Sequence, residues 1–291
     1  MTDFLFDVIA TELEDAVGRE NCSTRTIDKL THSVDYFWLS RMWADRGLRM
    51  PEGDFIVAPK DAKEVSAVLK IANYYKIPVA TWGAGGGTQG GAIPVCGGIV
   101  LDTKRMNKIY DVNEQSMYIE CGTGAIYKHI EWAANEKGYA TMHYPSSLTC
   151  STVGGFLAHR GIGVSSTKYG KIDDMVLQME VVLPNGDIIE TSPAPKHAAG
   201  PDLNQIFIGS EGTLGVMTKA QMRISSRVAS PCTWAALSSC AVAVNTVSPS
   251  ALHAVTVCAA GSTVRCILSI WKTVLPPSSF TLQRTFLSES S

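Results

Sequence analysis

The sequence predicts an α+β fold of two successive units, and three observations lead to this prediction. A strand, an amphipathic helix and a second strand follow one another between residues 51 and 80. A glycine-rich loop at 81–91 begins directly after the second strand. Strands and a further helix then alternate between residues 98 and 191. A chain that mixes strands and amphipathic helices in this way packs them as layers around a hydrophobic core.

The lead-in at residues 1–50 is polar and predicts mostly helical structure. It ends in an aromatic-rich block at 35–43, which favours an amphipathic docking segment, with a lid over a ligand as the alternative. A turn at 51–54 then leads into a short strand at 55–58. These features predict that the first folded unit begins near residue 51.

The helix of the first unit is predicted to begin after Pro59 and Asp61, because an aspartate accepts hydrogen bonds from the first N–H groups of a helix. Apolar residues recur at spacings of three and four through Tyr75 and form one face, namely Val65, Val68, Leu69 and Ala72. A strand at 77–80 follows. This strand, helix and strand form a compact unit that leads into the glycine-rich loop.

The loop at 81–91 contains six glycines among its eleven residues and no charged side chain. Without a Cβ, its backbone can adopt positive φ angles and approach a ligand closely with its N–H groups. A concave run of backbone N–H groups binds anions such as phosphate. The loop therefore predicts a phosphate cradle, and a plain glycine-rich hairpin loop is the alternative.

A Rossmann nucleotide-binding loop is excluded by the residues after the loop, although Gly85, Gly87 and Gly90 match its glycine spacing. That motif requires a helix to open at its third glycine and to face the pyrophosphate. Here Pro94 and the pair Gly97-Gly98 stand where the helix would elongate. No lysine follows in the P-loop arrangement, which also excludes a nucleoside-triphosphatase loop.

The second unit is predicted to contain several strands and one helix. A strand at 98–102 follows the glycine-rich loop and precedes this unit. The strands of the unit lie at 116–121, 176–183 and 188–191, and a turn at Asn185-Gly186 joins the last two into a hairpin. The helix spans 125–137 and stops at Gly138, a common helix terminator.

Two further loops of small residues lie in this unit. The loop at 145–155 is rich in hydroxyl groups, which offer hydrogen bonds to a polar ligand or, alternatively, form local turns within the loop. The loop at 209–215 lies between two apolar runs and contains Glu211. Its carboxylate favours a role in holding the loop through backbone N–H groups, with catalysis as an acid as the alternative.

Composition excludes several classes of partner. A net charge of −2 gives no electrostatic reason to expect nucleic acid or an anionic membrane surface. The first residues carry acids where a signal peptide carries bases, and no run of eighteen apolar residues occurs, so we expect a cytoplasmic protein without a membrane span. The eight cysteines form no CxxC pair and no metal-like cluster with the six histidines, so we expect reduced thiols and no metal site.

The three small-residue loops, taken in order, resemble the FAD-binding module of the vanillyl-alcohol oxidase and p-cresol methylhydroxylase superfamily, over roughly residues 50–225. The motifs at 181–186 and 209–215 have the spacing of that module. Within the superfamily the chain is similar to FAD-linked oxidases that include D-lactate and glycolate dehydrogenase subunits. It is also similar to alkyldihydroxyacetonephosphate synthases, and this likeness rests on 151–155, Arg160, Tyr169-Gly170 and Gly200-Pro201-Asp202.

The resemblance implies a p-cresol methylhydroxylase-type FAD domain at 51–225, with subdomains at about 51–103 and 104–225. It implies that the FAD pyrophosphate is wrapped by Thr81, Trp82, Gly83, Ala84, Gly85, Gly86, Gly87, Thr88 and Gln89. It implies that the flavin and ribityl region is lined by Ser146, Ser147, Leu148, Thr149, Cys150, Ser151 and Thr152. The adenosine half and the flavin edge would contact His159, Arg160, Gly161, Ile162, Glu211, Gly212, Thr213, Leu214, Gly215, Val216 and Met217. Some members of the superfamily attach FAD through a histidine in the first glycine-rich loop. Because 81–91 contains no histidine, the resemblance implies FAD bound without a covalent link.

The likeness stops near Arg223, where relatives continue into a cap domain that carries the substrate pocket. Residues 226–291 hold a single acid, Glu289, and show no helical periodicity, which favours the product of a shifted reading frame over a natural short tail. We therefore expect a truncated flavin-binding portion, with no catalytic residue identified and no activity of the chain on its own.

Three functions are compatible with these features. The first is FAD-dependent oxidation of a 2-hydroxy acid such as D-lactate or glycolate. The second is an alkyldihydroxyacetonephosphate synthase-like reaction of ether-lipid synthesis. The third is a flavin-binding protein without catalysis. Fold alone does not choose among them, because one fold supports many chemistries.

Overall fold

The computed structural model describes residues 3–192, 194 and 198–226 in full, and the backbone of 255–259 and 262–266. The chain divides into two compact units, Met1–Arg227 and Val228–Ser291. In the second unit, β12 (Val255–Ala259) pairs with β13 (Ser262–Cys266) as an antiparallel hairpin. The remainder of 227–291, on which the prediction of an aberrant tail falls, lies outside the described residues. All three small-residue loops belong to the first unit.

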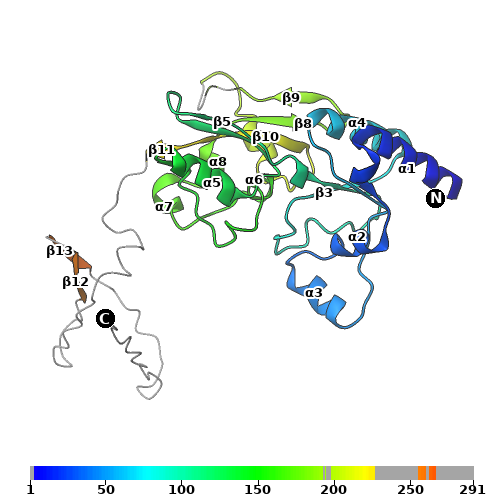
Figure 1. Cartoon of the computed structure of the whole chain (residues 1–291), viewed down its shortest axis with the longest axis horizontal. Helices are drawn as coiled ribbons and strands as arrows, with labels where there is room; N and C mark the ends of the chain where they lie inside the picture. Colours follow the sequence, from blue (N-terminus) through cyan, green and yellow to red (C-terminus); the bar gives the residue numbers. More distant parts are fainter. Residues whose placement is uncertain (1–2, 193, 195–197, 227–254, 260–261, 267–291) are drawn as a thin grey trace, which may run out of the picture. The chain divides into compact units, whose positions relative to one another are not determined.

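A four-stranded sheet forms the first subdomain of this unit (Figure 1). Its strands, in spatial order, are β1 (Cys22–Ser23), β2 (Phe55–Val57), β4 (Ile99–Asp102) and β3 (Val79–Trp82). β4 is parallel to both β2 and β3, whereas β1 is antiparallel to β2. The lead-in is thus mostly helical as predicted, but it also supplies the edge strand β1.

Two helices, α1 (Asp3–Val17) and α4 (Ala62–Tyr75), pack with this sheet. The α4 helix begins as the sequence predicts, because Asp61 Oδ1 accepts hydrogen bonds from Lys63 N and Glu64 N, each at 3.0 Å. Its predicted apolar face is buried against β2 and β4. The strand β3, which leads into the glycine-rich loop, thus packs against this buried core.

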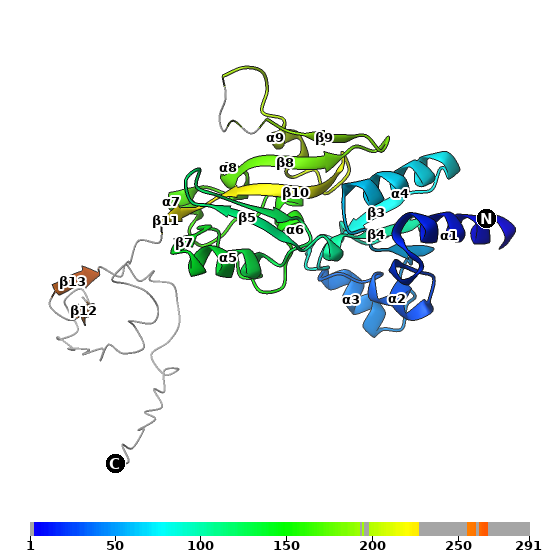
Figure 2. The same ribbon diagram turned by 45° about the horizontal axis from the view of Figure 1, so that its top comes forward.

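A five-stranded antiparallel sheet forms the second subdomain (Figure 2). Its strands, in spatial order, are β5 (Ile109–Asn113), β6 (Tyr118–Gly122), β10 (Val216–Arg223), β8 (Val176–Val182) and β9 (Ile188–Glu190). One face packs in a common core with α5 (Tyr127–Glu136), α6 (Val153–Ala158) and α8 (Ile172–Met175). The shorter elements are η1 (Arg19–Asn21), α2 (Thr26–Thr31), α3 (Trp38–Asp45), η2 (Thr103–Arg105), β7 (Tyr139–Ala140), α7 (Ser166–Tyr169), α9 (Asn204–Phe207) and β11 (Ser225–Ser226).

The likeness to the FAD-binding module also predicts a strand before each of the three small-residue loops, and the structure differs in this feature. Only the glycine-rich loop directly follows a strand, namely β3. The apolar run before the loop at 209–215 forms the short helix α9 instead. Its residues Asn204 and Phe207 are buried, and Asn204 Oδ1 accepts a hydrogen bond from the Thr191 hydroxyl at 2.7 Å. Tertiary packing therefore decides the conformation of a run too short to show a period.

No helix among the described residues combines the length and the apolar character that a membrane crossing requires. The described residues likewise contain no group of three or more histidine, cysteine or acidic side chains arranged to hold a metal ion.

Candidate functional site

A cleft of about 510 Å³ runs between the two subdomains, and all three small-residue loops contribute to its walls. The first wall consists of the whole predicted stretch from Thr81 to Gln89, with Gly91 and Ala92. The second wall includes Ser146, Ser147, Ser151 and Thr152, and the third includes Glu211, Gly212, Gly215, Val216 and Met217. His159 and Ile162 also line the cleft. Most of the sequence-predicted site residues thus come together around one cavity.

The glycine-rich loop presents its backbone to this cleft. Within the described residues, no backbone N–H from Gly83 to Ala92 donates a hydrogen bond to another protein group. Backbone N–H groups of folded proteins are nearly always paired, with protein, water or ligand. A continuous run of unpaired donors is a site for an anion with several oxygens.

Trp82 packs with its ring against the glycine-rich loop at Gly85. Its side chain is 4% exposed, and a Cβ built at Gly85 would lie only 2.7 Å from its ring. Gly85 also has a φ of 65°, which a side chain disfavours. Gly86 differs, because a Cβ there would meet only the Ser151 hydroxyl, at 3.2 Å. Gly85 is therefore required by the fold of the loop, and Gly86 leaves space for a ligand.

The hydroxyl-rich loop is tied to the second subdomain by backbone and side-chain hydrogen bonds. Thr152 Oγ1 accepts a hydrogen bond from Gly155 N at 3.2 Å and so caps α6. Gly154 N donates to the Thr123 carbonyl at 2.7 Å. The hydroxyls of Ser146 and Ser147 make no hydrogen bond to other described residues. Both alternatives for this loop thus apply, because Thr152 serves the fold and the two serines remain available to a ligand.

The third loop reaches across to the first subdomain. A Cβ built at Gly212, whose φ is 76°, would lie 2.2 Å from Thr81 Oγ1, so only glycine fits at this crossing. Glu211 has a φ of 53° and directs its carboxylate toward Gly91. That carboxylate accepts no hydrogen bond from the described residues, so the expectation that it holds the loop through backbone N–H groups is not met. It is available to a donor on a ligand.

Residues 53–192 match the model of the FAD binding domain family. These residues belong to that family. The solved structure of p-cresol methylhydroxylase with substrate bound shares the fold, with a TM-score of 0.65 and 21% identity over 79% of this chain and 45% of that one. The fold is therefore the p-cresol methylhydroxylase-type FAD-binding fold that the loops predict.

Relatives of the FAD-binding domain include FAD-linked oxidoreductases. The chain is 35% identical to the glycolate oxidase subunit GlcD of Bacillus subtilis, over 71% of this chain and 42% of that protein. It is 40% identical to the D-lactate dehydrogenase of Archaeoglobus fulgidus, over 60% of this chain and 40% of that protein. A solved alkyldihydroxyacetonephosphate synthase matches with a TM-score of 0.71 and 28% identity, over 76% of this chain and 40% of that one. The chain thus spans less than half the length of these relatives.

Seven residues predicted to bind the cofactor do not line the cleft, namely Leu148, Thr149, Cys150, Arg160, Gly161, Thr213 and Leu214. The Arg160 side chain instead connects its own segment to Asp173 and to the segment 205–208. Its guanidinium donates to the carbonyls of Ile208 at 2.9 Å and Gln205 at 3.2 Å, and pairs with Asp173 at 3.4 Å. The geometry therefore assigns Arg160 a structural contact beneath the site.

Gly91, Pro145, Gly154 and Gly155 also line the cleft; they lie in the predicted loops but not among the residues that the resemblance assigns to FAD. Sequence reasoning missed Ala92, Thr103, Thr123, Phe156 and Ala158. Gly154 and Gly155 end the hydroxyl-rich loop, so extending the predicted site to the end of that loop would have included them. Thr103 and Thr123 are single threonines with no surrounding pattern. Their positions are set only by the pairing of the strands that precede them.

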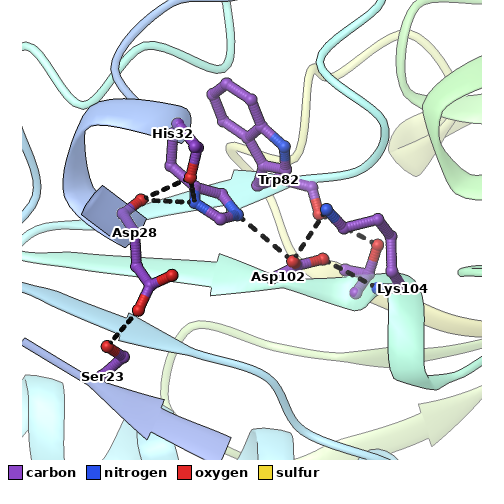
Figure 3. A network of polar contacts seen from close by, with 8 residues as sticks. Ser23, Asp28, His32, Trp82, Asp102 and Lys104 are labelled. Carbon is purple, nitrogen blue, oxygen red and sulfur yellow. Dashed lines mark hydrogen bonds and ion pairs between the residues drawn. The ribbon is translucent and has the colours of Figure 1, made fainter. Parts of the chain in front are cut away.

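A polar network connects α2 to the strand that lies beside the start of the glycine-rich loop (Figure 3). His32 Nε2 lies 3.2 Å from Asp102 Oδ2, and its Nδ1 lies 2.8 Å from the carbonyl oxygen of Asp28. The His32 ring also meets the Trp82 ring edge-on, at 5.1 Å between centroids. Burial alone would raise the pKa of the Asp102 carboxyl, but hydrogen bonds from His32 and the Lys104 backbone lower it overall. The His32 ring, held by Asp28 and Asp102, therefore packs against Trp82, the residue whose ring lies beside Gly85 of the loop.

His143 lies in an aromatic cluster behind the cleft. It is fully buried, and neither ring nitrogen has a hydrogen-bond partner among the described residues. Its ring packs edge-on against Tyr127 and Phe156, each at 5.1 Å. Burial, and to a lesser extent the neighbouring His159, lowers the pKa of His143 to about 4. The ring is therefore neutral in the folded protein at neutral pH.

We expect His143→Phe to reduce the loss of stability on acidification. Between pH 6.5 and pH 4 the unfolded chain binds a proton at His143 and the folded chain does not, so the free energy of unfolding falls as the pH falls. The free energy of unfolding of wild type should fall by about 3 kcal/mol more than that of the variant between pH 7 and pH 4. Urea unfolding at both pH values measures this difference, and parallel losses would contradict it.

Proposed function

We propose that the protein binds FAD without a covalent link and takes part in the oxidation of a 2-hydroxy acid such as D-lactate or glycolate. The observation that carries the proposal is the run of unpaired N–H groups from Gly83 to Ala92, which faces a cleft inside an FAD-binding domain. The relatives named glycolate oxidase subunit and D-lactate dehydrogenase support this substrate class.

The residues present fit the cofactor. The backbone of 83–92 would hold the diphosphate, because N–H dipoles bind its charge without a cation. The hydroxyls of Ser146 and Ser147, and the Glu211 carboxylate, offer neutral and acceptor groups for the hydroxyls of the ribityl chain and the ribose. The stretch 81–91 contains no histidine, which supports a non-covalent mode. The bound flavin supplies the acceptance of two electrons, and the protein supplies position and electrostatics.

Reconstitution of the full chain with FAD tests the proposal. After gel filtration the protein should retain a flavin absorbance spectrum, and acid precipitation should release all of the flavin into the supernatant. Under anaerobic conditions, bleaching of the spectrum by D-lactate or glycolate, with L-lactate as a matched control, would support the substrate class and contradict the expectation that the chain is inactive on its own. Failure to retain FAD would refute the cofactor assignment. Retained flavin that no 2-hydroxy acid bleaches agrees with a chain that is inactive on its own and favours a flavin-binding protein without catalysis.

A second candidate is a reaction like that of alkyldihydroxyacetonephosphate synthase, favoured by the structural match at a TM-score of 0.71. The two candidates differ in the substrate that the flavoprotein consumes. Incubation with an acyl-dihydroxyacetone phosphate and a fatty alcohol, with the lipid products separated by chromatography, tests the second. An ether lipid formed without bleaching by 2-hydroxy acids would favour the second candidate over the first.

A further inference from the structure

The segment before α3 lies against the glycine-rich loop, although it is outside the residues that match the FAD binding domain family. A Cβ built at Gly90 would lie 3.2 Å from the Phe37 ring. One built at Gly87 would lie 3.7 Å from Asp35 Oδ2. Part of the aromatic-rich block therefore packs against the loop, and Asp35 brings a carboxylate to the same place.

The Asp35 carboxylate is buried, with 1% of the residue exposed. Its Oδ1 accepts hydrogen bonds from Phe37 N at 3.0 Å and from the Ser40 hydroxyl at 3.4 Å. Its Oδ2 is buried and has no hydrogen-bond donor among the described residues. A buried carboxylate oxygen without a donor is unfavourable, because it has lost water and gained no partner.

Unpaired donors lie in the adjoining loop. Gly87 belongs to the run from Gly83 to Ala92 in which no N–H has an acceptor among the described residues. An unpaired acceptor on one side of the loop thus meets unpaired donors in the loop itself. Pairing one of these N–H groups with Oδ2 would orient that peptide and leave the others directed at the cleft.

We propose that Asp35 is a positioning residue for the diphosphate of the bound dinucleotide, whose Oδ2 accepts a hydrogen bond from an N–H of the glycine-rich loop in the bound state. The inference rests on the proposed binding of FAD. Asp35 does not touch the ligand, because it does not line the cleft. It acts through the loop, and its effect is confined to ligands that carry a diphosphate.

Asp35→Asn tests this role, because asparagine keeps the shape and the acceptor toward Phe37 and Ser40 but replaces Oδ2 with an NH₂ group that cannot accept. The dissociation constants of FAD and ADP should rise about tenfold, the effect of one hydrogen bond to a charged group. Riboflavin, which has no diphosphate, should bind as it does to wild type. The unfolding midpoint without ligand should stay the same or increase, because an unpaired buried charge has been removed.

Ser40→Ala serves as the matched control, since it removes a partner of Oδ1 and leaves Oδ2 unchanged. This variant should not reduce the affinity for FAD and ADP relative to the affinity for riboflavin. FAD binding by Asp35→Asn that is as tight as in wild type, or tighter, would overturn the inference. A fall in the unfolding midpoint of the ligand-free variant that accompanies its loss of FAD affinity would also overturn it. If wild type binds neither FAD nor ADP, the proposed function is overturned and the inference falls with it.

Discussion

Replacing Gly86 with valine is expected to abolish FAD binding while leaving the fold intact. A Cβ at Gly86 meets only the Ser151 hydroxyl, at 3.2 Å, and the backbone there has no positive φ. The branched side chain would therefore project into the cleft that the diphosphate requires. Flavin absorbance after gel filtration should fall to background, and the unfolding midpoint without ligand should stay near that of wild type.

Gly85→Val is the matched comparison, because the neighbouring glycine serves the loop itself. Its Cβ would lie 2.7 Å from the Trp82 ring, and its φ of 65° disfavours a branched side chain. This variant should lose both flavin and ligand-free stability, the latter by at least about 1 kcal/mol. If the Gly86 variant retains FAD, the diphosphate does not lie along this loop, and the cofactor assignment of the loop is wrong.

Replacing Arg160 with alanine is expected to destabilise the domain by about 2 kcal/mol, with a smaller effect on FAD affinity. The change removes the donor shared by the carbonyls of Gln205 and Ile208, and it removes a partner of Asp173. The urea midpoint of the ligand-free protein measures the first effect, and fluorescence titration with FAD measures the second. This expectation reverses the role that the family resemblance implies for Arg160.

Arg160→Lys refines the test, because lysine keeps the charge but cannot donate to both carbonyls in the guanidinium geometry. It should recover only part of the lost stability. A loss of FAD affinity that exceeds the loss of stability in Arg160→Ala would return the residue to the cofactor site.

The sequence predicts well those features that depend on neighbouring residues. Asp61 identifies the start of α4, and the spacing of Val65, Val68 and Leu69 identifies its buried face, because capping and helical period are local properties. The glycine density of 81–91 likewise predicts a loop with exposed N–H groups. The residue types alone therefore locate the glycine-rich wall of the cleft, whereas the family resemblance predicted the other two walls.

Features that depend on distant contacts could not be predicted. Asp35 lies far along the chain from Gly87, and nothing around it in the sequence indicates that one oxygen lacks a donor. The family resemblance assigns Arg160 to the cofactor, yet its carbonyl partners are supplied by α9 and the residue after it. Thr123 enters the cleft only because β6 ends beside β10.

The path of the chain between β3 and β4 has a consequence for engineering. These strands are parallel neighbours, so a tight turn cannot join them. The chain must run from the carboxyl end of β3 back to the amino end of β4. Here the return path is the segment 83–98, which contains the proposed diphosphate cradle and no helix. The segment must therefore be long enough to run back along both strands. Attempts to redesign the loop should change residue types at constant length, because a deletion would alter the path that carries the unpaired N–H groups of Gly83 to Ala92.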